Sequence, residues 1–85
     1  MKLFLTKSFE KDYARLPSDI QDALDRSLMM LIENPRHPSL HLKKMRGARG
    51  IWDGRISRAC RFTFMLERDL CVLRRTGTYD ILRTP

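Results

Sequence analysis

The feature that most constrains the fold is an apolar stripe between Pro17 and Pro35. Apolar or small residues recur there at intervals of three and four: Ile20, Ala23, Leu24, Ser27, Leu28, Leu31 and Ile32. This spacing places them on one side of an α-helix, and Asp19, Asp22, Asp25 and Arg26 fall on the opposite side. The stripe therefore predicts an amphipathic helix that starts after Pro17, stops at Asn34-Pro35, and must bury one face against another element.

A shorter helical pattern precedes this stripe. Phe9, Tyr13 and Leu16 stand at i, i+4 and i+7, Thr6 or Ser8 offers an N-cap, and Pro17 ends the segment. Ser18-Asp19-Ile20-Gln21 matches a capping box, in which the first side chain bonds the third helical amide and the last reaches back. With an apolar strand over residues 2–5, the first third of the chain predicts a strand followed by a helical hairpin.

The second half of the chain carries the pattern of a β-meander. Residues 51–57, 59–66 and 70–76 are rich in β-formers and are separated by turns. On the middle segment, alternation places Phe62, Phe64 and Leu66 on one side and Ala59, Arg61, Thr63 and Met65 on the other. These elements predict an α+β fold, with a three-stranded antiparallel meander in one sheet and the helices on one of its faces. The second face of the sheet is left for function.

The two cysteines, Cys60 and Cys71, fall on strands of this meander. A hairpin around residues 67–69 that places residue 66 opposite residue 70 also places Cys60 opposite residue 76 and Cys71 opposite Met65. This register predicts two separate core thiols rather than a disulfide. With only two histidines, His37 and His41, no spacing is typical of a zinc site, so we expect neither a metal nor another cofactor.

Length and hydropathy exclude several classes of protein. Eighty-five residues suffice for one domain, and we interpret residues 1–85 as a single unit. No run of about 18 apolar residues could span a membrane. The start, Met1-Lys2-Leu3-Phe4-Leu5, is too short for a secretory signal and lacks a cleavage site. We therefore expect a cytoplasmic protein without a membrane partner.

Positive charge is concentrated in the second half. The net charge is +7; residues 1–35 hold five basic and six acidic side chains, whereas residues 36–85 hold twelve basic and four acidic ones. Such asymmetry favours a polyanion or an acidic protein as partner. Within the basic half, Trp52-Asp-Gly-Arg-Ile-Ser-Arg-Ala-Cys-Arg61 brings three arginines to two predicted strands joined near residues 57–59. Arginines on a rigid sheet can bind phosphates in a bidentate manner.

Whether Arg55 and Arg61 share a face depends on the turn between their strands; if they do, the open face of the predicted sheet would collect them, with Arg58 or Arg75 as a further candidate and Tyr79 beside them. Arg55, Arg61 and Tyr79 are the candidate catalytic residues, and the expected RNA-binding residues are Lys43, Lys44, Arg46, Arg58, Arg75 and Trp52. Guanidiniums can stabilise a pentacoordinate phosphorane, and Trp52 or Tyr79 could stack a base. Cleavage by the RNA's own 2′-OH needs a proton acceptor and a proton donor but no metal. Tyr79 is the first candidate, followed by Lys43 or Lys44 and then His41; each also has a plain structural interpretation, and Trp52 could equally anchor the core.

Several motifs together resemble the RelE/ParE superfamily of type II toxin-antitoxin toxins. They are Phe-x-Lys-Asp-Tyr from Phe9, Leu-Pro at 16, Asn-Pro at 34, Leu-Lys-Lys-Met-Arg-Gly from Leu42, Trp-x-x-Arg-Ile from Trp52, Cys-Arg-Phe-Thr-Phe from Cys60 and Gly-Thr-Tyr-Asp from Gly77. Each motif is degenerate, and their order and spacing across nearly the whole chain make the signal specific. The resemblance implies a small antiparallel sheet under a helical hairpin and, most often, an mRNA endoribonuclease that acts at the ribosome and is neutralised by an antitoxin.

The resemblance also implies where the site lies. Arginines on the central strands and an aromatic or His near the C-terminus act on the scissile phosphate in ribonuclease members, and the matching positions are Arg55, Arg61, Thr78 and Tyr79. Members with a similar Trp-x-x-Arg-Ile pattern usually add a Glu in the connector and a His at the C-terminal site; residues 35–50 here hold no acid, and Tyr79 stands in place of the His. Two other functions stay open: a ParE-like inhibitor of DNA gyrase, and an inactive member that only binds its antitoxin.

Overall fold

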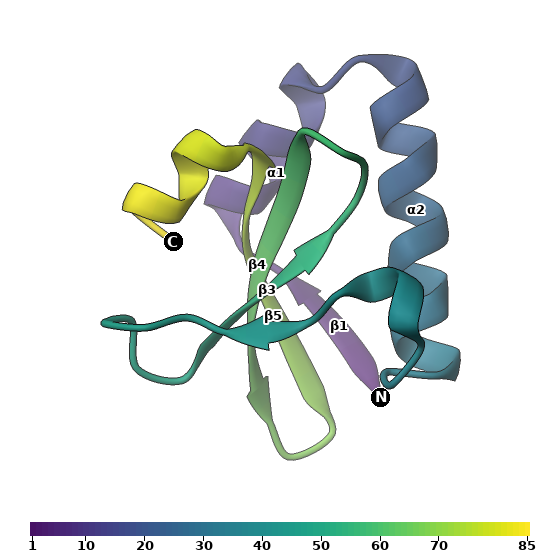
Figure 1. Ribbon diagram of the computed structural model, residues 1–85. Coiled ribbons are helices and arrows are strands. Elements are labelled where there is room, and N and C mark those ends of the chain that lie inside the picture. The colour runs from purple at the N-terminus through teal and green to yellow at the C-terminus, as the bar shows by residue number, and fades with distance from the viewer.

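Two helices lie against one face of a five-stranded sheet in a computed structural model that describes residues 1–85 (Figure 1). The elements follow in the order β1 (Lys2–Leu5), α1 (Lys7–Arg15), α2 (Ser18–Glu33), the 3-10 turn η1 (Pro38–Leu40), β2 (Lys43–Lys44), β3 (Ile51–Arg55), β4 (Cys60–Glu67), β5 (Leu70–Thr78) and the 3-10 turn η2 (Tyr79–Arg83). The predicted α+β class, the helical hairpin and the meander are confirmed.

The sheet differs from the prediction in its edges. Its order is β1-β5-β4-β3-β2, and β1 pairs parallel with β5, so that the sheet is mixed rather than antiparallel throughout. The two-residue strand β2 pairs with β3 at the other edge. The helical hairpin lies between β1 and the meander and returns the chain to the same sheet, which permits the parallel pairing.

The core lies between the helices and the covered face of the sheet. Nine buried residues form it: Phe9, Leu24, Leu28, Leu31, Leu40, Phe62, Phe64, Cys71 and Leu73. The rings of Phe62 and Phe64 stack at 5.6 Å between centroids, and Tyr13 and Leu16 pack against the cluster. The apolar stripe of α2 and the inward positions of β4 therefore meet, as their periodicities predicted.

The helix starts confirm one prediction and correct another. Thr6 caps α1, since its Oγ1 accepts a hydrogen bond of 3.2 Å from the amide of Phe9. The capping box at Ser18 is wrong, because Pro17 is the N-cap of α2 and no side chain caps that helix. Gln21 instead donates from Nε2 to the carbonyl of Tyr13 at 2.8 Å, which satisfies a carbonyl at the end of α1.

The predicted register of the β4–β5 hairpin is also wrong. Arg68 takes a left-handed conformation with φ 54°, so that Glu67 pairs with Leu70 across a two-residue turn. A bulge next to the Thr63–Phe64 step then shifts the pairing again, and Cys60 lies opposite Thr78 while Cys71 lies opposite Leu66. Both thiols are nevertheless free and buried, as predicted, and burial raises the pKa of Cys71 to about 11.

None of the helices combines the length and the apolar character that crossing a membrane would require.

Candidate functional site

Arg55 and Arg61 are direct partners on the uncovered face of the sheet. Arg55 ends β3, Arg61 follows the start of β4, and their Cα atoms are paired in the antiparallel ladder. Directly opposite residues of antiparallel strands project from the same face, here the one away from Phe62. The turn between the strands is closed by a 3.0 Å hydrogen bond from the Ile56 amide to the carbonyl of Cys60. The two arginines are partly buried, and the sheet fixes their spacing.

Tyr79 joins this pair from the end of β5. Its hydroxyl accepts a hydrogen bond of 2.5 Å from Nη2 of Arg61, and the guanidinium carbon lies 4.9 Å from the centre of its ring. Tyr79 begins η2 and is half exposed. Gly77, which pairs with Arg61, has φ 153° and thus takes a backbone conformation that side chains disfavour at the entry to η2. The sheet and η2 together therefore bring Arg55, Arg61 and Tyr79 into one site.

A second row of side chains crosses the same face next to this pair. Lys43 of β2 pairs with Asp53 of β3, Asp53 with Thr63 of β4, and Thr63 with Arg75 of β5. Asp53 is only 2% exposed, and its burial raises the pKa of its carboxyl, while the charges of Lys43 and Arg61 oppose that rise. The sequence interpretation missed Asp53. The signal available was its place two residues before Arg55, which predicts the same face of the strand.

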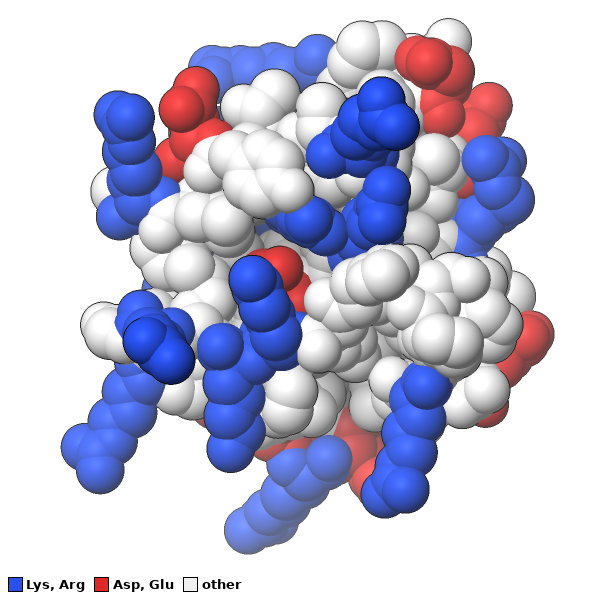
Figure 2. All heavy atoms as spheres, in the orientation of Figure 1, with Lys and Arg blue, Asp and Glu red and all other residues white.

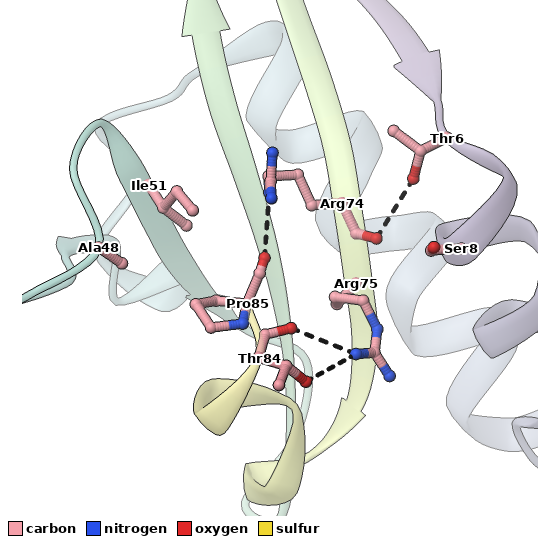
Figure 3. Close-up of a pocket in the computed structure, with 8 residues that line it drawn as sticks. All are labelled: Thr6, Ser8, Ala48, Ile51, Arg74, Arg75, Thr84 and Pro85. Carbon is pink, nitrogen blue, oxygen red and sulfur yellow. Dashed lines mark hydrogen bonds between the residues drawn. The ribbon is translucent and has the colours of Figure 1, made fainter.

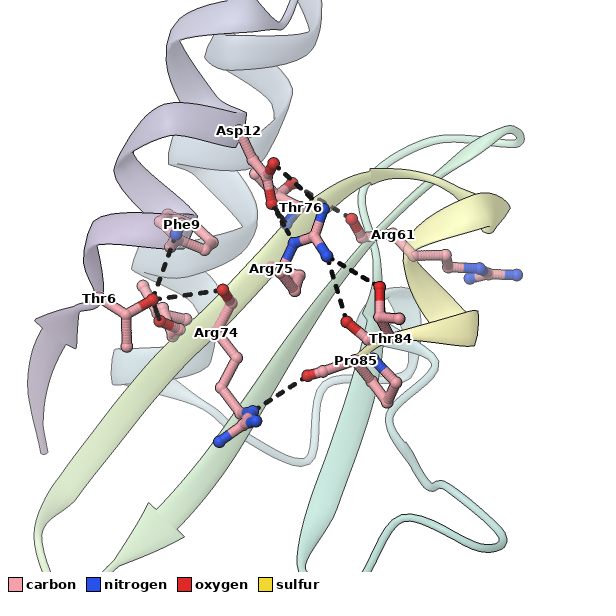
Figure 4. Close-up of polar contacts among 10 residues, drawn as sticks. Thr6, Phe9, Asp12, Arg61, Arg74, Arg75, Thr76, Thr84 and Pro85 are labelled. Carbon is pink, nitrogen blue, oxygen red and sulfur yellow. Dashed lines mark hydrogen bonds and ion pairs between the residues drawn. The ribbon is translucent and has the colours of Figure 1, made fainter.

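Arg75 is held by α1 rather than free on the open face (Figure 4). Its Nε donates to Oδ2 of Asp12 at 2.6 Å, and its Nη1 donates to the carbonyl of Thr84 at 3.2 Å. Asp12 also accepts a 3.2 Å hydrogen bond from the amide of Thr76. Thr76 lies on the part of β5 that β1 does not pair with. The ion pair with Asp12 raises the pKa of Arg75. Arg75 therefore links α1 to the sheet, and its Nε and Nη1 donors are already bound to Asp12 and Thr84.

The other expected RNA-binding residues are dispersed. Trp52 lies on the helix-covered side, where its ring stacks on Phe64 at 6.4 Å, and the ammonium of Lys44 lies 5.5 Å from its centre. Arg46 and Arg58 are exposed on the loops after β2 and β3. His37 accepts from the Ser39 amide at 3.1 Å and so caps η1. Of these residues, Lys43 alone shares the row of Asp53. Contact of any of them with RNA stays a prediction.

A cleft of about 590 Å³ lies between the start of α1, β5 and the C-terminal segment (Figure 3). Arg74 lines it and donates from Nε to the carbonyl of Pro85 at 3.0 Å and from Nη1 toward the sulfur of Met65. Arg75 lines it as well, bound to Thr84. The arginines of this cleft thus serve to hold residues 84–85 against the sheet.

The surface agrees with the charge pattern of the sequence. Figure 2 shows Lys and Arg side chains around a hollow near the centre of the view, with acidic atoms in it. Nowhere in the chain do three or more His, Cys, Asp or Glu side chains gather closely enough to bind a metal ion. The chemistry that the site offers is therefore that of guanidiniums, a phenol, an ammonium and one recessed carboxyl. Such a set can bind and neutralise a phosphate and can move protons.

Comparison with solved structures identifies the fold of this chain. By sequence, neither a protein-family model nor a curated protein matches the chain. By structure, YafQ from Escherichia coli is similar, with a TM-score of 0.81 at 20% identity over 95% of this chain and 96% of YafQ. A YoeB/ParE toxin from Agrobacterium tumefaciens gives 0.78 at 18% identity over 93% and 99%. The intact RelBE toxin-antitoxin complex of E. coli gives 0.73 at 19% identity over 91% and 94%. This chain has the RelE-like fold over nearly its whole length.

Proposed function

We propose that this chain, which has the fold of YafQ and RelE, is the toxin of a type II toxin-antitoxin system and a metal-independent endoribonuclease that cleaves mRNA on the ribosome. The observation that carries this proposal is the contact between Arg61 and Tyr79 beside Arg55 on the uncovered face. Two guanidiniums and a phenol in one place match the needs of phosphodiester cleavage. A gyrase inhibitor or a protein that only binds an antitoxin needs no such set.

The reaction uses the 2′-OH of the RNA as nucleophile. The bond from O2′ to phosphorus forms, the bond from phosphorus to O5′ breaks, and the products are a 2′,3′-cyclic phosphate and a 5′-OH. Arg55 and Arg61 bind the phosphate oxygens and stabilise the additional negative charge of the phosphorane. The ribosome supplies the ordered mRNA, and the exposed lysines and arginines of residues 43–58 bind RNA phosphates around the site.

The partner in the resting cell is an antitoxin. Two of the similar structures, DinJ-YafQ and RelBE of E. coli, are toxin-antitoxin complexes. The positive charge of residues 36–85 suits a partner with an acidic segment. We propose that such a protein binds this chain and blocks access to Arg61 and Tyr79.

Cleavage of mRNA in a purified translation system tests the proposal. The wild-type protein is added to ribosomes stalled on a defined mRNA in a buffer with a chelator-treated protein stock, and the 3′ and 5′ ends of the fragments are mapped. We expect cuts that depend on the ribosome and leave a cyclic phosphate. Arg61→Ala should not cut, whereas Lys2→Ala, an exposed cation paired with Leu70 at the far end of the sheet, should cut as the wild type does. Intact mRNA with the wild-type protein would contradict the proposal.

A further inference from the structure

Asp53 is the one carboxylate of the basic half that the fold places beside the arginine pair. Only four acidic residues lie beyond position 35, and Glu67 and Asp69 belong to the turn at the end of the β4–β5 hairpin. Asp80 is exposed on η2. Asp53 instead lies in the middle of β3, two residues before Arg55 and directly opposite Thr63, which is two residues after Arg61. It therefore shares a face and a neighbourhood with both arginines.

The carboxylate of Asp53 has no partner. It makes no hydrogen bond, and no cation lies within ion-pair distance, since the one ion pair of the chain joins Arg75 to Asp12. The neighbouring Thr63 Oγ1 is the one fully enclosed side-chain oxygen or nitrogen without a hydrogen bond. The Asp53 oxygens also lack a hydrogen bond, but they are not fully buried. The small solvent-exposed area of this residue therefore lies at its carboxylate oxygens. A recessed, unpaired carboxylate is unfavourable unless something else compensates for it.

The contact between Tyr79 and Arg61 implies that a group other than Tyr79 must accept the proton. A guanidinium has donors only, so the Tyr79 oxygen is the acceptor of their hydrogen bond and its own proton points elsewhere. This geometry suits Tyr79 to give a proton rather than to take one. Cleavage by the 2′-OH then needs a second group that accepts a proton, and charged Lys43 has no lone pair to offer.

We propose, on the premise that the protein cleaves RNA, that Asp53 is the general base that accepts the 2′-OH proton. As O2′ bonds to phosphorus, its proton passes to an oxygen of Asp53, and as the bond to O5′ breaks, Tyr79 gives its phenolic proton to O5′. Water afterwards removes the proton from Asp53 and returns one to Tyr79, so that both groups are restored. Burial of Asp53 raises the pKa of its carboxyl, which makes it a stronger base than an exposed aspartate.

The charges around Asp53 come from each element packed beside it. Lys43 faces it from β2, Arg61 from β4 and Arg55 from the same strand, while Arg75 lies one position further along its row and is neutralised by Asp12. The charges of Lys43 and Arg61 oppose the rise in the pKa of Asp53 that desolvation causes. The bound phosphate adds a negative charge that acts in the other direction.

Single-turnover cleavage of mRNA on programmed ribosomes, followed from about pH 5 to 9, tests this role. For the wild type, we expect the rate to rise with pH at low pH and to level off above the pKa of Asp53. Asp53→Asn, which keeps the size of the side chain, should cut about 100-fold more slowly or worse and lose the rising limb. Asp80→Asn, the matched change at the exposed carboxylate next to Tyr79, should keep both the rate and the limb.

Each outcome decides one question. A wild-type protein that cuts no RNA would overturn the proposed function itself. Two results with an active wild type would overturn the role of Asp53 alone. In the first, Asp53→Asn cuts within about threefold of the wild-type rate. In the second, Asp53→Asn is slower than the wild type by the same factor at every pH. If circular dichroism shows that Asp53→Asn does not fold, the pH profiles of the wild type and of His41→Gln test the proposal instead. A cleavage rate that rises with pH at low pH in both proteins supports a carboxyl base. A profile without this rise in either protein overturns the proposal.

Discussion

The guanidinium of Arg61 donates a 2.5 Å hydrogen bond to the hydroxyl oxygen of Tyr79, although the two residues are 18 positions apart. The contact joins the second residue of β4 to the first residue of η2, so it forms only when the meander and the C-terminal turn have both folded. It defines the donor and the acceptor at the site, and it links the arginine that we propose to bind the phosphate to a group that can move a proton.

Arg61→Ala should remove the larger part of the activity without unfolding the protein. Loss of one donor to a developing charge typically lowers the rate about 100- to 1,000-fold. Arg61→Lys should restore little, because an ammonium cannot bind two phosphate oxygens in a fork. Growth arrest after induced expression measures the effect, with circular dichroism as the control for folding. An unchanged arrest would remove Arg61 from the site.

Tyr79→Phe should slow cleavage about 100-fold on ordinary RNA, because it removes the proton donor to O5′. A substrate with sulfur in place of the bridging 5′-oxygen has a leaving group that needs no protonation. On that substrate the variant and the wild type should cut at similar rates. A deficit of the same size on both substrates would mean that Tyr79 acts in binding and not as an acid.

Binding of single-stranded RNA should depend on salt in proportion to the phosphates held. For about four phosphates on single-stranded RNA, the logarithm of the affinity should fall against the logarithm of salt concentration with a slope of roughly −3. Lys43→Gln should lower the slope by about one unit if this lysine holds a phosphate. Fluorescence anisotropy at several salt concentrations measures both values, and a slope near zero would assign the basic half to another partner.

Asp12→Asn should destabilise the fold by about 1 to 3 kcal/mol, since Asp12 accepts both from Arg75 and from the edge amide of Thr76. Urea unfolding followed by circular dichroism gives the change. Asp22→Asn on the exposed side of α2 is the matched control and should change stability by less than about 0.5 kcal/mol. Equal stability of both variants would show that the ion pair contributes nothing measurable.

The effect of Asp53→Asn on stability should depend on pH. Burial raises the pKa of Asp53 in the folded protein above its value in the unfolded chain, so the folded state binds the proton more tightly. Its contribution to the free energy of unfolding is therefore present below the unfolded pKa of about 3.9 and is lost as pH rises through the folded pKa. Relative to the wild type, Asp53→Asn should gain stability as the pH rises from about 4 through the folded pKa of Asp53. A difference that does not change over this range would contradict the raised pKa.

Local patterns were enough to predict most of this fold. The stripe of α2, the cap at Thr6 and the alternation around Phe62 and Phe64 each depend on residues close in sequence, and the structure confirms them. These features follow from periodicity and capping chemistry alone. The strands of Arg55 and Arg61 were also predicted, but whether the two side chains share a face depended on the turn between them, and the structure shows that they pair directly.

What the sequence did not predict depends on distant contacts. The parallel pairing of β1 with β5 joins residues nearly 70 positions apart, and the bulge near Arg74 shifts the register in a way that no local pattern marks. No motif marked Asp53 in the sequence. Its burial depends on the neighbouring strands β2 and β4, which place Lys43 and Thr63 on either side of it. For Trp52 the sequence left an RNA-binding role and a core role open, and the structure places its ring against Phe64 on the covered side.

We propose that the protein arrests growth by cutting mRNA through the site of Arg61. The most direct measurement is induced expression of the wild type and of Arg61→Ala, with mRNA ends and the SOS response followed in the same cells. We expect the wild type to give new mRNA ends within translated regions before any SOS induction, and Arg61→Ala to give neither cleavage nor arrest. Prompt SOS induction with intact mRNA would contradict the account and would indicate a gyrase inhibitor instead.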